Sequence, residues 1–88
     1  MNEKWQVIID RFPKGSIIKA KVLDHKHYGM YLDIGCEPFI CFVPITEISE
    51  SRISISEFPK VNSYVQAVIL DYSLDDRLQI WVSIKRVT

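Results

Sequence analysis

Apolar residues near the start of the chain recur at the spacing of an α-helix. Positions i, i+3, i+4 and i+7 form one stripe on a helix surface, and here they are Trp5, Ile8, Ile9 and Phe12. The Pro-Lys-Gly sequence at 13–15 then ends the helix, because proline and glycine both disfavour its continuation. The pattern predicts a helix of one or two turns.

Beyond residue 15 the pattern changes to the period of two that is typical of β-strands. The segment 16–24 alternates, with Lys19, Lys21 and Leu23 opposite Ile18, Ala20 and Val22. The segment 28–34 alternates in the same way, with Tyr31 and Asp33 opposite Met30, Leu32 and Ile34. Residues 39–43 are apolar throughout, so they predict a third strand without indicating which of its faces is buried.

Two further strands are predicted at 64–72 and 78–85, joined by a turn-forming sequence at 73–76. Before them, residues 44–48 can form one helical turn, and 49–60 is the longest connection in the chain. Five strands with a long connection after the third favour an all-β fold, a five-stranded Greek-key OB-fold barrel with a short N-terminal helix. An open meander or a small SH3-like barrel is the alternative. We expect one domain over 1–88, with the helix in 1–14 and the barrel in 15–86.

The same alternation predicts which side chains fill the barrel. The residues that share the inward phase, and that we expect to be buried, are Ile18, Val22, Leu32, Ile34, Val68, Ile80 and Val82. Tyr31 and Trp81 have the opposite phase, so we expect both rings to be exposed on one side of the barrel.

Composition and charge restrict the classes of function. Apolar residues make up 48% of the chain and charged residues 25%, which is the balance of a globular domain. Eleven Lys and Arg are matched by eleven Asp and Glu, so any basic face for nucleic acid must be local. No apolar run reaches the roughly 20 residues of a membrane helix, and the first residues lack the order of a secretion signal. We expect a cytoplasmic protein without membrane contact.

Five sequence blocks, in order, resemble the S1-type RNA-binding domain, which is repeated in ribosomal protein S1 and present in polynucleotide phosphorylase. The blocks are GSIIKAKV at 15–22, YGMYLDI at 28–34, CFVPITEI at 41–48, VNSYVQAVI at 61–69 and VSIK at 82–85. The resemblance covers about residues 5–85. It implies an OB-fold and the binding of single-stranded RNA.

Three positions depart from the family's pattern. Pro44 stands where the family often has a histidine beside its RNA-stacking rings, and Asn62 stands where it has a glycine before the fourth strand. Asparagine tolerates left-handed backbone, so the turn at residue 62 can survive. The connection between the last two strands is one residue longer than usual, so either Arg77 or Gln79 can take the family's arginine position.

The resemblance also implies a set of RNA-binding residues. Tyr28 and Tyr31 match the family's two stacking phenylalanines, and Trp81 points outward from the last strand. The basic residues that could follow the phosphates beside them are Lys19, Lys21, Lys26 and Arg77. A purely structural interpretation is open as well: Tyr28 would close the barrel rim, Trp81 would fill a gap under the helix, and the lysines would only solvate a strand.

Neither a metal site nor a catalytic site is indicated. His25 and His27 precede the second strand whereas Cys36 and Cys41 follow it, and six strand residues span about 20 Å, too far for ligands that must lie within about 2.3 Å of one zinc ion. A Cys36–Cys41 disulfide is sterically conceivable, but free thiols are expected in a reducing compartment. No nucleophile, base and orienting acid are arranged together. We expect a binding module without cofactor or enzymatic activity.

Two hypotheses for the partner remain open at this stage. The first is weak, largely sequence-tolerant binding of single-stranded RNA, such as messenger RNA or RNA of the ribosome. The second is a protein-interaction module that has lost RNA binding, an interpretation favoured by zero net charge, by Pro44 and by the apolar Ile40 and Phe42.

Overall fold

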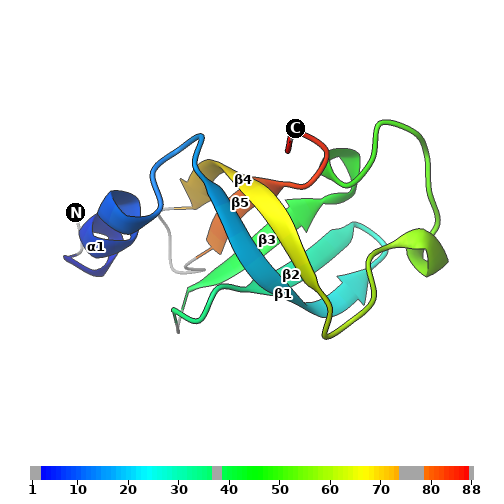
Figure 1. Ribbon diagram of the computed structural model, residues 1–88, viewed down its shortest axis with the longest axis horizontal. Coiled ribbons are helices and arrows are strands. Elements are labelled where there is room, and N and C mark those ends of the chain that lie inside the picture. Colours follow the sequence, from blue (N-terminus) through cyan, green and yellow to red (C-terminus); the bar gives the residue numbers. More distant parts are fainter. Residues whose placement is uncertain (1–2, 37–38, 74–78, 88) are drawn as a thin grey trace.

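The computed structural model describes residues 3–36, 39–73 and 79–87, and its elements follow the predicted order (Figure 1). A helix, α1 (Glu3–Arg11), is followed by strands β1 (Ile17–Lys26), β2 (Gly29–Asp33) and β3 (Ile40–Pro44). The 3-10 turns η1 (Ile45–Glu47) and η2 (Ile55–Glu57) come next, and then strands β4 (Tyr64–Ser73) and β5 (Gln79–Ser83). The helical turn predicted at 44–48 is confirmed as η1. The turn η2, inside the long connection, was not anticipated.

The five strands close into a barrel in the order β1-β2-β3-β5-β4, with β4 pairing back onto β1. The pairs β1/β2, β1/β4, β2/β3 and β4/β5 are antiparallel, whereas β3 and β5 run parallel. This topology confirms the predicted five-stranded OB-fold and excludes the open meander. Because the barrel is closed, each of the five described strands pairs with two neighbours.

The strand β1 belongs to both halves of the barrel. Its residues 17–21 pair with β4, and its residues 21–26 pair with β2. A β-bulge between Val22 and Asp24 bends the strand and shifts its register by one residue, which is how a ten-residue strand curves around a small barrel. As a result Asp24 lies directly opposite Tyr31.

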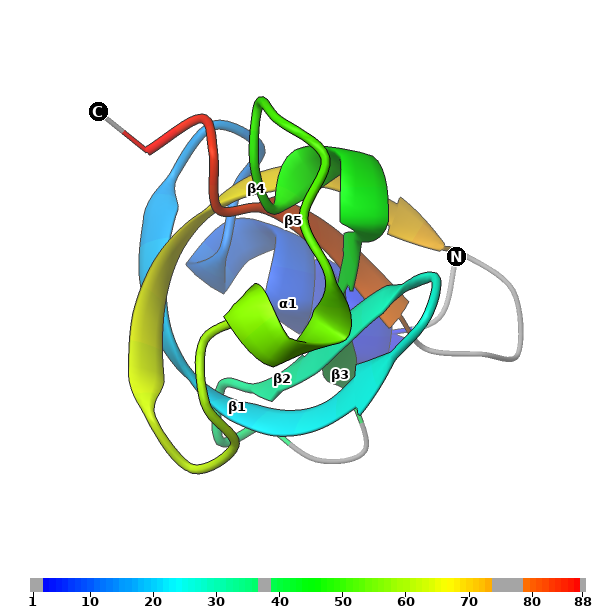
Figure 2. The same ribbon diagram turned by 90° about the vertical axis from the view of Figure 1, so that its right-hand side faces the viewer.

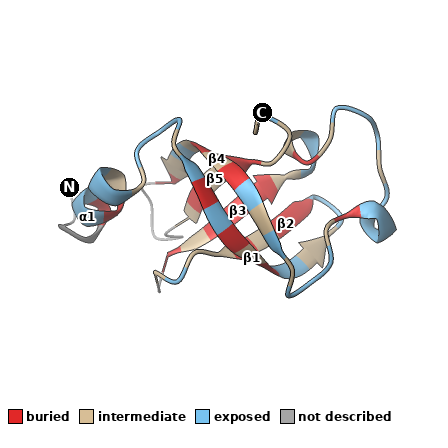
Figure 3. Cartoon of the chain, viewed as in Figure 1, coloured by how far each residue is buried: buried red, intermediate tan, exposed pale blue. Residues whose placement is uncertain are grey.

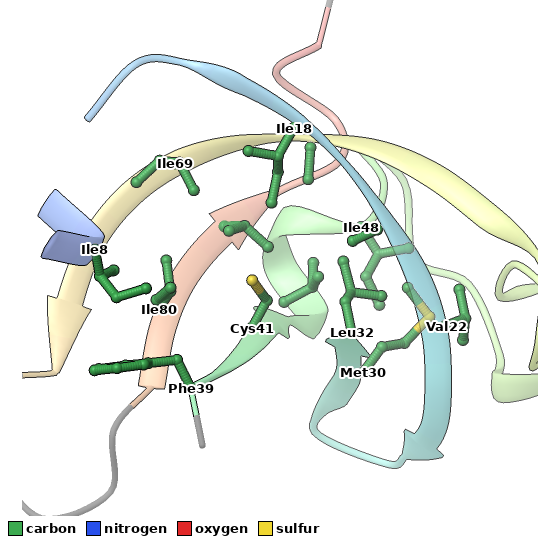
Figure 4. Close-up of a cluster of buried hydrophobic side chains, with 14 of the residues drawn as sticks. Ile8, Ile18, Val22, Met30, Leu32, Phe39, Cys41, Ile48, Ile69 and Ile80 are labelled. Carbon is green, nitrogen blue, oxygen red and sulfur yellow. The ribbon is translucent and has the colours of Figure 1, made fainter. Parts of the chain in front are cut away.

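The core is filled mainly by the alternating residues of the strands (Figures 3 and 4). Of the seven predicted core residues, five are buried: Ile18, Val22, Leu32, Ile80 and Val82. The prediction is wrong for Val68, because Ala67 and Ile69 take the inward positions of β4 and Val68 pairs with the exposed Ile17. It is also wrong for Ile34, which lies beyond the end of β2 and is only partly buried against the core.

Opposite ends of the barrel are closed by α1 and by the segment around η2, as the view along the barrel shows (Figure 2). At the first end, the edge of the buried Trp5 indole packs against the rings of Phe39 and Tyr72, with centroids 4.8 and 5.9 Å apart. The tryptophan that fills the space between the helix and the barrel is therefore Trp5, a residue of α1 itself, and not Trp81. The predicted helical stripe of residue 5 and its partners is confirmed by the burial of Trp5 and Ile8.

At the second end, Phe58 enters the core and His25 holds the connection to β1. The His25 ring packs edge-on against Phe58, and its Nε2 lies 2.6 Å from the carbonyl oxygen of Pro59, so histidine 25 serves as an anchor for this segment. Asn62 adopts φ 73°, and its backbone N–H donates to the carbonyl oxygen of Val22. This confirms that asparagine can supply the left-handed turn before β4.

The burial of Leu32 gives a test of the barrel's register. Its side chain is completely buried in the middle of β2, so Leu32→Ala should lower the free energy of unfolding by about 2 to 5 kcal/mol in chemical denaturation. Val7→Ala is the matched control, because Val7 lies on α1 with 60% of its surface exposed, and its change should stay within about 0.5 kcal/mol. Equal denaturation midpoints for the two variants would contradict this register.

Candidate nucleic-acid interface

Strand pairing brings three aromatic rings side by side on the outer face of β2, β3 and β5. Tyr31 on β2 is directly opposite Phe42 on β3, and Phe42 is directly opposite Trp81 on β5. Tyr28 stands just before β2. Together with Gln79 these residues line an open, shallow hollow of about 310 Å³. We call this set, Tyr28, Tyr31, Phe42, Gln79 and Trp81, the aromatic patch.

Phe42 is the centre of the aromatic patch. Its ring centroid lies 5.7 Å from that of Tyr28, 5.2 Å from that of Tyr31 and 5.3 Å from that of Trp81, with the tryptophan ring perpendicular to it. Only 7% of Phe42 is exposed, although it lies outside the cluster that fills the barrel. The neighbouring rings shield Phe42 from solvent, and tilted and edge-to-face contacts at these distances hold such rings in fixed orientations.

The two rings predicted to be exposed on one side do share that side. Tyr31 and Trp81 both leave the core, as their phase in the strands predicts. Neither ring is exposed to the extent that was predicted, however, since both are half-buried against Phe42. Tyr28 is more accessible, with 44% of its surface exposed. Each ring thus has a packed side and a free side.

A close backbone contact at Gly29 allows the rings to pack in this way. A Cβ atom built on Gly29 would lie 2.1 Å from the carbonyl oxygen of Val43 and 2.9 Å from the Phe42 ring. Any side chain at this position would therefore force β2 away from β3 or displace Phe42. The Tyr-Gly sequence at 28–29 thus places one ring of the aromatic patch and leaves room for another.

The two tyrosines of the patch touch through their hydroxyl groups. The Tyr28 and Tyr31 oxygens are 3.4 Å apart. This hydrogen bond, followed by partial burial, raises the pKa of Tyr31 above its ordinary value, and a smaller effect of Gln79 lowers it. Each hydroxyl can donate to, or accept from, a polar ligand group.

A family model of the S1 RNA-binding domain matches residues 11–83 of this sequence. The chain belongs to the S1 RNA-binding domain family. No protein with a curated description gives a significant match.

Solved structures carry the same domain. GSP13 from Bacillus subtilis is 27% identical to the chain with a TM-score of 0.74, over 84% of this chain and 56% of that one. A chain in the a/eIF2alpha-aDim2p-rRNA complex from Pyrococcus horikoshii OT3 is 25% identical with a TM-score of 0.74, over 85% and 45%. The alpha subunit of aIF2 from Pyrococcus abyssi is 26% identical with a TM-score of 0.72, over 85% and 29%. The match thus spans between 29% and 56% of these longer chains.

The aromatic patch of this S1 domain contains three of the seven residues that the sequence nominated, Tyr28, Tyr31 and Trp81. Phe42 and Gln79 were not among the seven: Phe42 was considered only for a protein-interaction face, and Gln79 only as the alternative to Arg77 at the family's arginine position. The run at 39–43 has no period, so only the pairing of β3 with its neighbours shows that Phe42 faces outward. Gln79 lines the hollow, whereas Arg77 lies outside the described residues.

The three nominated lysines make their described contacts with residues outside the aromatic patch. Lys26 is closest along the chain, but its ammonium group lies 3.1 Å from the Asp24 carboxylate, and this pairing lowers the pKa of Asp24. Lys19 lies over the exposed Tyr64 ring, 5.5 Å from its centroid, on the β1/β4 side of the barrel. Lys21 is paired with Tyr64 of β4 on one side of β1 and with Asp33 of β2 on the other.

Among the described residues no group of three His, Cys, Asp or Glu could hold a metal ion. Both cysteines are free; Cys41 is part of the core, and burial raises the pKa of its thiol to about 12, so it serves packing and not chemistry. No helix in the described ranges is long and apolar enough to cross a membrane.

The hydrogen bond between the tyrosines can be tested by titration. Tyr28→Phe removes the oxygen that keeps Tyr31 protonated, so the pKa of Tyr31 should fall toward its ordinary value. Carbon-13 NMR of the tyrosine Cζ atoms across alkaline pH measures this shift. Tyr72 is an internal control at the α1 end of the barrel, and its midpoint should not move. An unchanged Tyr31 midpoint would contradict the contact.

The close approach at Gly29 predicts an unusually costly glycine substitution. Gly29→Ala should destabilise the S1 domain by more than about 2 kcal/mol, because the added methyl group meets backbone as well as a ring. Gly35→Ala is the control: Gly35 has φ +79° but nothing within 4 Å, so it reports the conformational cost alone, about 1 kcal/mol. If denaturation showed equal losses, Phe42 would not pack against residue 29.

Proposed function

We propose that this S1 domain binds single-stranded RNA by stacking bases on the aromatic patch. The observation that carries the proposal is the convergence of Tyr28, Tyr31 and Trp81 around Phe42, on the β2 and β3 face where OB-folds bind oligonucleotides. Membership of the S1 RNA-binding domain family supports it. Bases in a single strand are unstacked and offer flat faces to such rings.

The composition of the patch indicates little preference for sequence. Ring faces accept every base, because each base has a π-face. The groups of the patch that can form hydrogen bonds to base edges are the Gln79 amide, the two tyrosine hydroxyls and the Trp81 indole N–H. Pro44, which stands where the family often has a histidine, ends β3 opposite Gly29 and offers neither a flat ring nor a hydrogen-bond donor. We therefore expect sequence-tolerant binding.

The charges indicate modest affinity. The chain has no net charge, and the lysine nearest the patch along the chain already has a carboxylate partner. Since phosphate neutralisation supplies most of the sequence-independent affinity of nucleic-acid binders, a patch that relies on stacking binds weakly. A protein-docking role for this face is not favoured, because the rings form the open platform that stacking requires and the chain matches an RNA-binding family.

The setting we propose is messenger RNA or ribosomal RNA in the cytoplasm. One matched structure is a complex that contains rRNA, and another is a subunit of an archaeal protein named aIF2. We also propose that the domain acts by binding alone. The S1 domain is a nucleic-acid-binding module, and the surface that we propose for binding is made of aromatic rings.

Alanine substitution of the patch tests the function. Tyr31→Ala and Trp81→Ala should each weaken the binding of mixed-sequence single-stranded RNA about five-fold or more, since a stacked base contributes about 1 to 3 kcal/mol. Fluorescence anisotropy with labelled RNA measures the dissociation constants. Chemical denaturation of both variants verifies that the barrel is intact.

Tyr64→Ala is the matched control for this experiment. Tyr64 has 63% of its surface exposed and lies at the start of β4, outside the aromatic patch. Its removal should leave RNA binding unchanged. Equal losses from Tyr31→Ala and Tyr64→Ala, or folded patch variants that bind as well as the parent, would overturn the proposed surface.

A further inference from the structure

A second hollow of about 510 Å³ lies beside η1, outside the aromatic patch. It is bordered by Ile45 and Thr46, by the segment 49–53 and by Lys85, and we call it the loop hollow. Figures 1 and 2 both show η1, the segment that follows it and the C-terminal part of the chain next to one another at this end of the barrel. No residue nominated from the sequence belongs to it.

The walls of the loop hollow are held in place by the fold. The backbone amides of Ile84 and Lys85 both donate to the carbonyl oxygen of Glu47, at 3.0 Å each, which fixes the C-terminal part of the chain onto η1. Ile53 packs against the barrel core and anchors the opposite wall. A site whose walls are already ordered loses less entropy when a ligand enters.

Apart from the Glu50 carboxylate, the polar side chains of the loop hollow are of the kinds that contact phosphates. Arg52 and Lys85 supply two cations, and Thr46, Ser49 and Ser51 supply hydroxyl groups. No aromatic side chain borders the hollow, so nothing in it can stack a base. The chemistry suits the phosphate backbone of a nucleic acid and not its bases.

The nearby carboxylates leave both cations available. Glu47 is held by Arg86, whose Nε and terminal nitrogen donate to the two carboxylate oxygens at 2.9 and 3.3 Å. This contact is the main reason that the pKa of Glu47 is lowered, and Lys85 adds a smaller effect. Glu50 lies near Arg86 as well. Among the described residues, neither Arg52 nor Lys85 forms an ion pair.

One backbone hydrogen bond joins a residue of the loop hollow to a residue of the aromatic patch. The amide of Ile45, which borders the loop hollow, donates to the carbonyl oxygen of Tyr28, which belongs to the patch, at 2.9 Å. Three cations and two carboxylates leave this end with a net charge of only +1 (Arg52, Lys85, Arg86, Glu47 and Glu50). So small a charge attracts a phosphate only weakly from solution. It can still bind one when the same RNA strand is already held at a neighbouring site, which raises the local concentration of phosphate.

We propose that the loop hollow binds the phosphate backbone of the same RNA strand whose bases stack on the aromatic patch, with Arg52 and Lys85 as the contacting cations. The proposal rests on the proposed function, because the patch brings the strand to the hollow. It predicts that the RNA footprint extends past Tyr28 along η1. It also predicts that affinity and salt dependence increase with RNA length.

The test compares oligouridylates of about four and about twelve nucleotides by fluorescence anisotropy, the first at the lower limit of OB-fold site sizes and the second well inside their range. The longer RNA should bind more tightly. Arg52→Gln and Lys85→Gln should each weaken it roughly three- to eight-fold at about 50 mM salt and reduce the slope of log K against log salt by about 0.7, the value for one phosphate on a single strand. Binding of the shorter RNA should not change.

Lys60→Gln is the matched control. Lys60 is exposed and borders neither hollow, so this variant loses one positive charge without losing a proposed contact. The inference is overturned if Lys60→Gln weakens the longer RNA as much as the other two variants, if both RNA lengths bind equally, or if the glutamine variants weaken both lengths alike.

Tyr31→Ala separates failure of this inference from failure of the proposed function. If Tyr31→Ala weakens both RNAs whereas Arg52→Gln and Lys85→Gln weaken neither, the aromatic patch stands and the loop hollow is not used. If neither RNA binds the parent protein, the proposed function fails and the inference fails with it.

Discussion

The parallel pairing of β3 with β5 closes the barrel and forms the aromatic patch at the same time. Cys41 pairs with Ile80 on the inner face, where both side chains are completely buried. The next pair in the same register is Phe42 with Trp81, on the outer face. Because the side chains of a strand alternate, one register places the core pair and the aromatic pair together, and a shift by one residue would exchange them. Core stability and the position of the rings therefore depend on the same hydrogen-bonded ladder.

A cluster of rings outside the core normally requires an explanation. Phe42 is almost fully covered, yet its cover consists of Tyr28, Tyr31 and Trp81 and not of the barrel interior. The rings fix one another in edge-on and tilted contacts and keep their outward sides accessible. Gly29 makes this arrangement possible, because only a residue without Cβ lets β2 approach Val43 and the Phe42 ring so closely. The platform is therefore ordered before any ligand arrives, which lowers the entropic cost of binding.

The charged side chains of this domain act on their immediate neighbours and give the molecule no net charge. Cations and carboxylates are equal in number, and several of them are paired at the surface, such as Lys26 with Asp24 and Lys14 with Asp71. Exposed pairs of this kind contribute little to stability, but they do reduce the positive potential that would otherwise attract phosphates. Arg52 and Lys85 have no such partner in the described part of the chain. In the binding mode that we propose, the place of these two cations in the loop hollow matters more than the net charge of the domain.

The sequence by itself determined the features that depend on near neighbours in the chain. The helical stripe of Trp5 and Ile8, the alternation of β1 and β2 and the left-handed turn at Asn62 are all local, and the motif order identified the S1 domain. The outward phase of Tyr31 and Trp81 was predictable because each stands between buried neighbours in a regular strand. The tertiary structure alone decided the rest. Phe42 belongs to an aperiodic apolar run, so only its pairing with Tyr31 and Trp81 shows its direction. The inward phase of β4, the separation of Lys19 from the rings and the meeting of Lys85 with the loop after η1 each depend on contacts between residues far apart in sequence, which no local pattern contains.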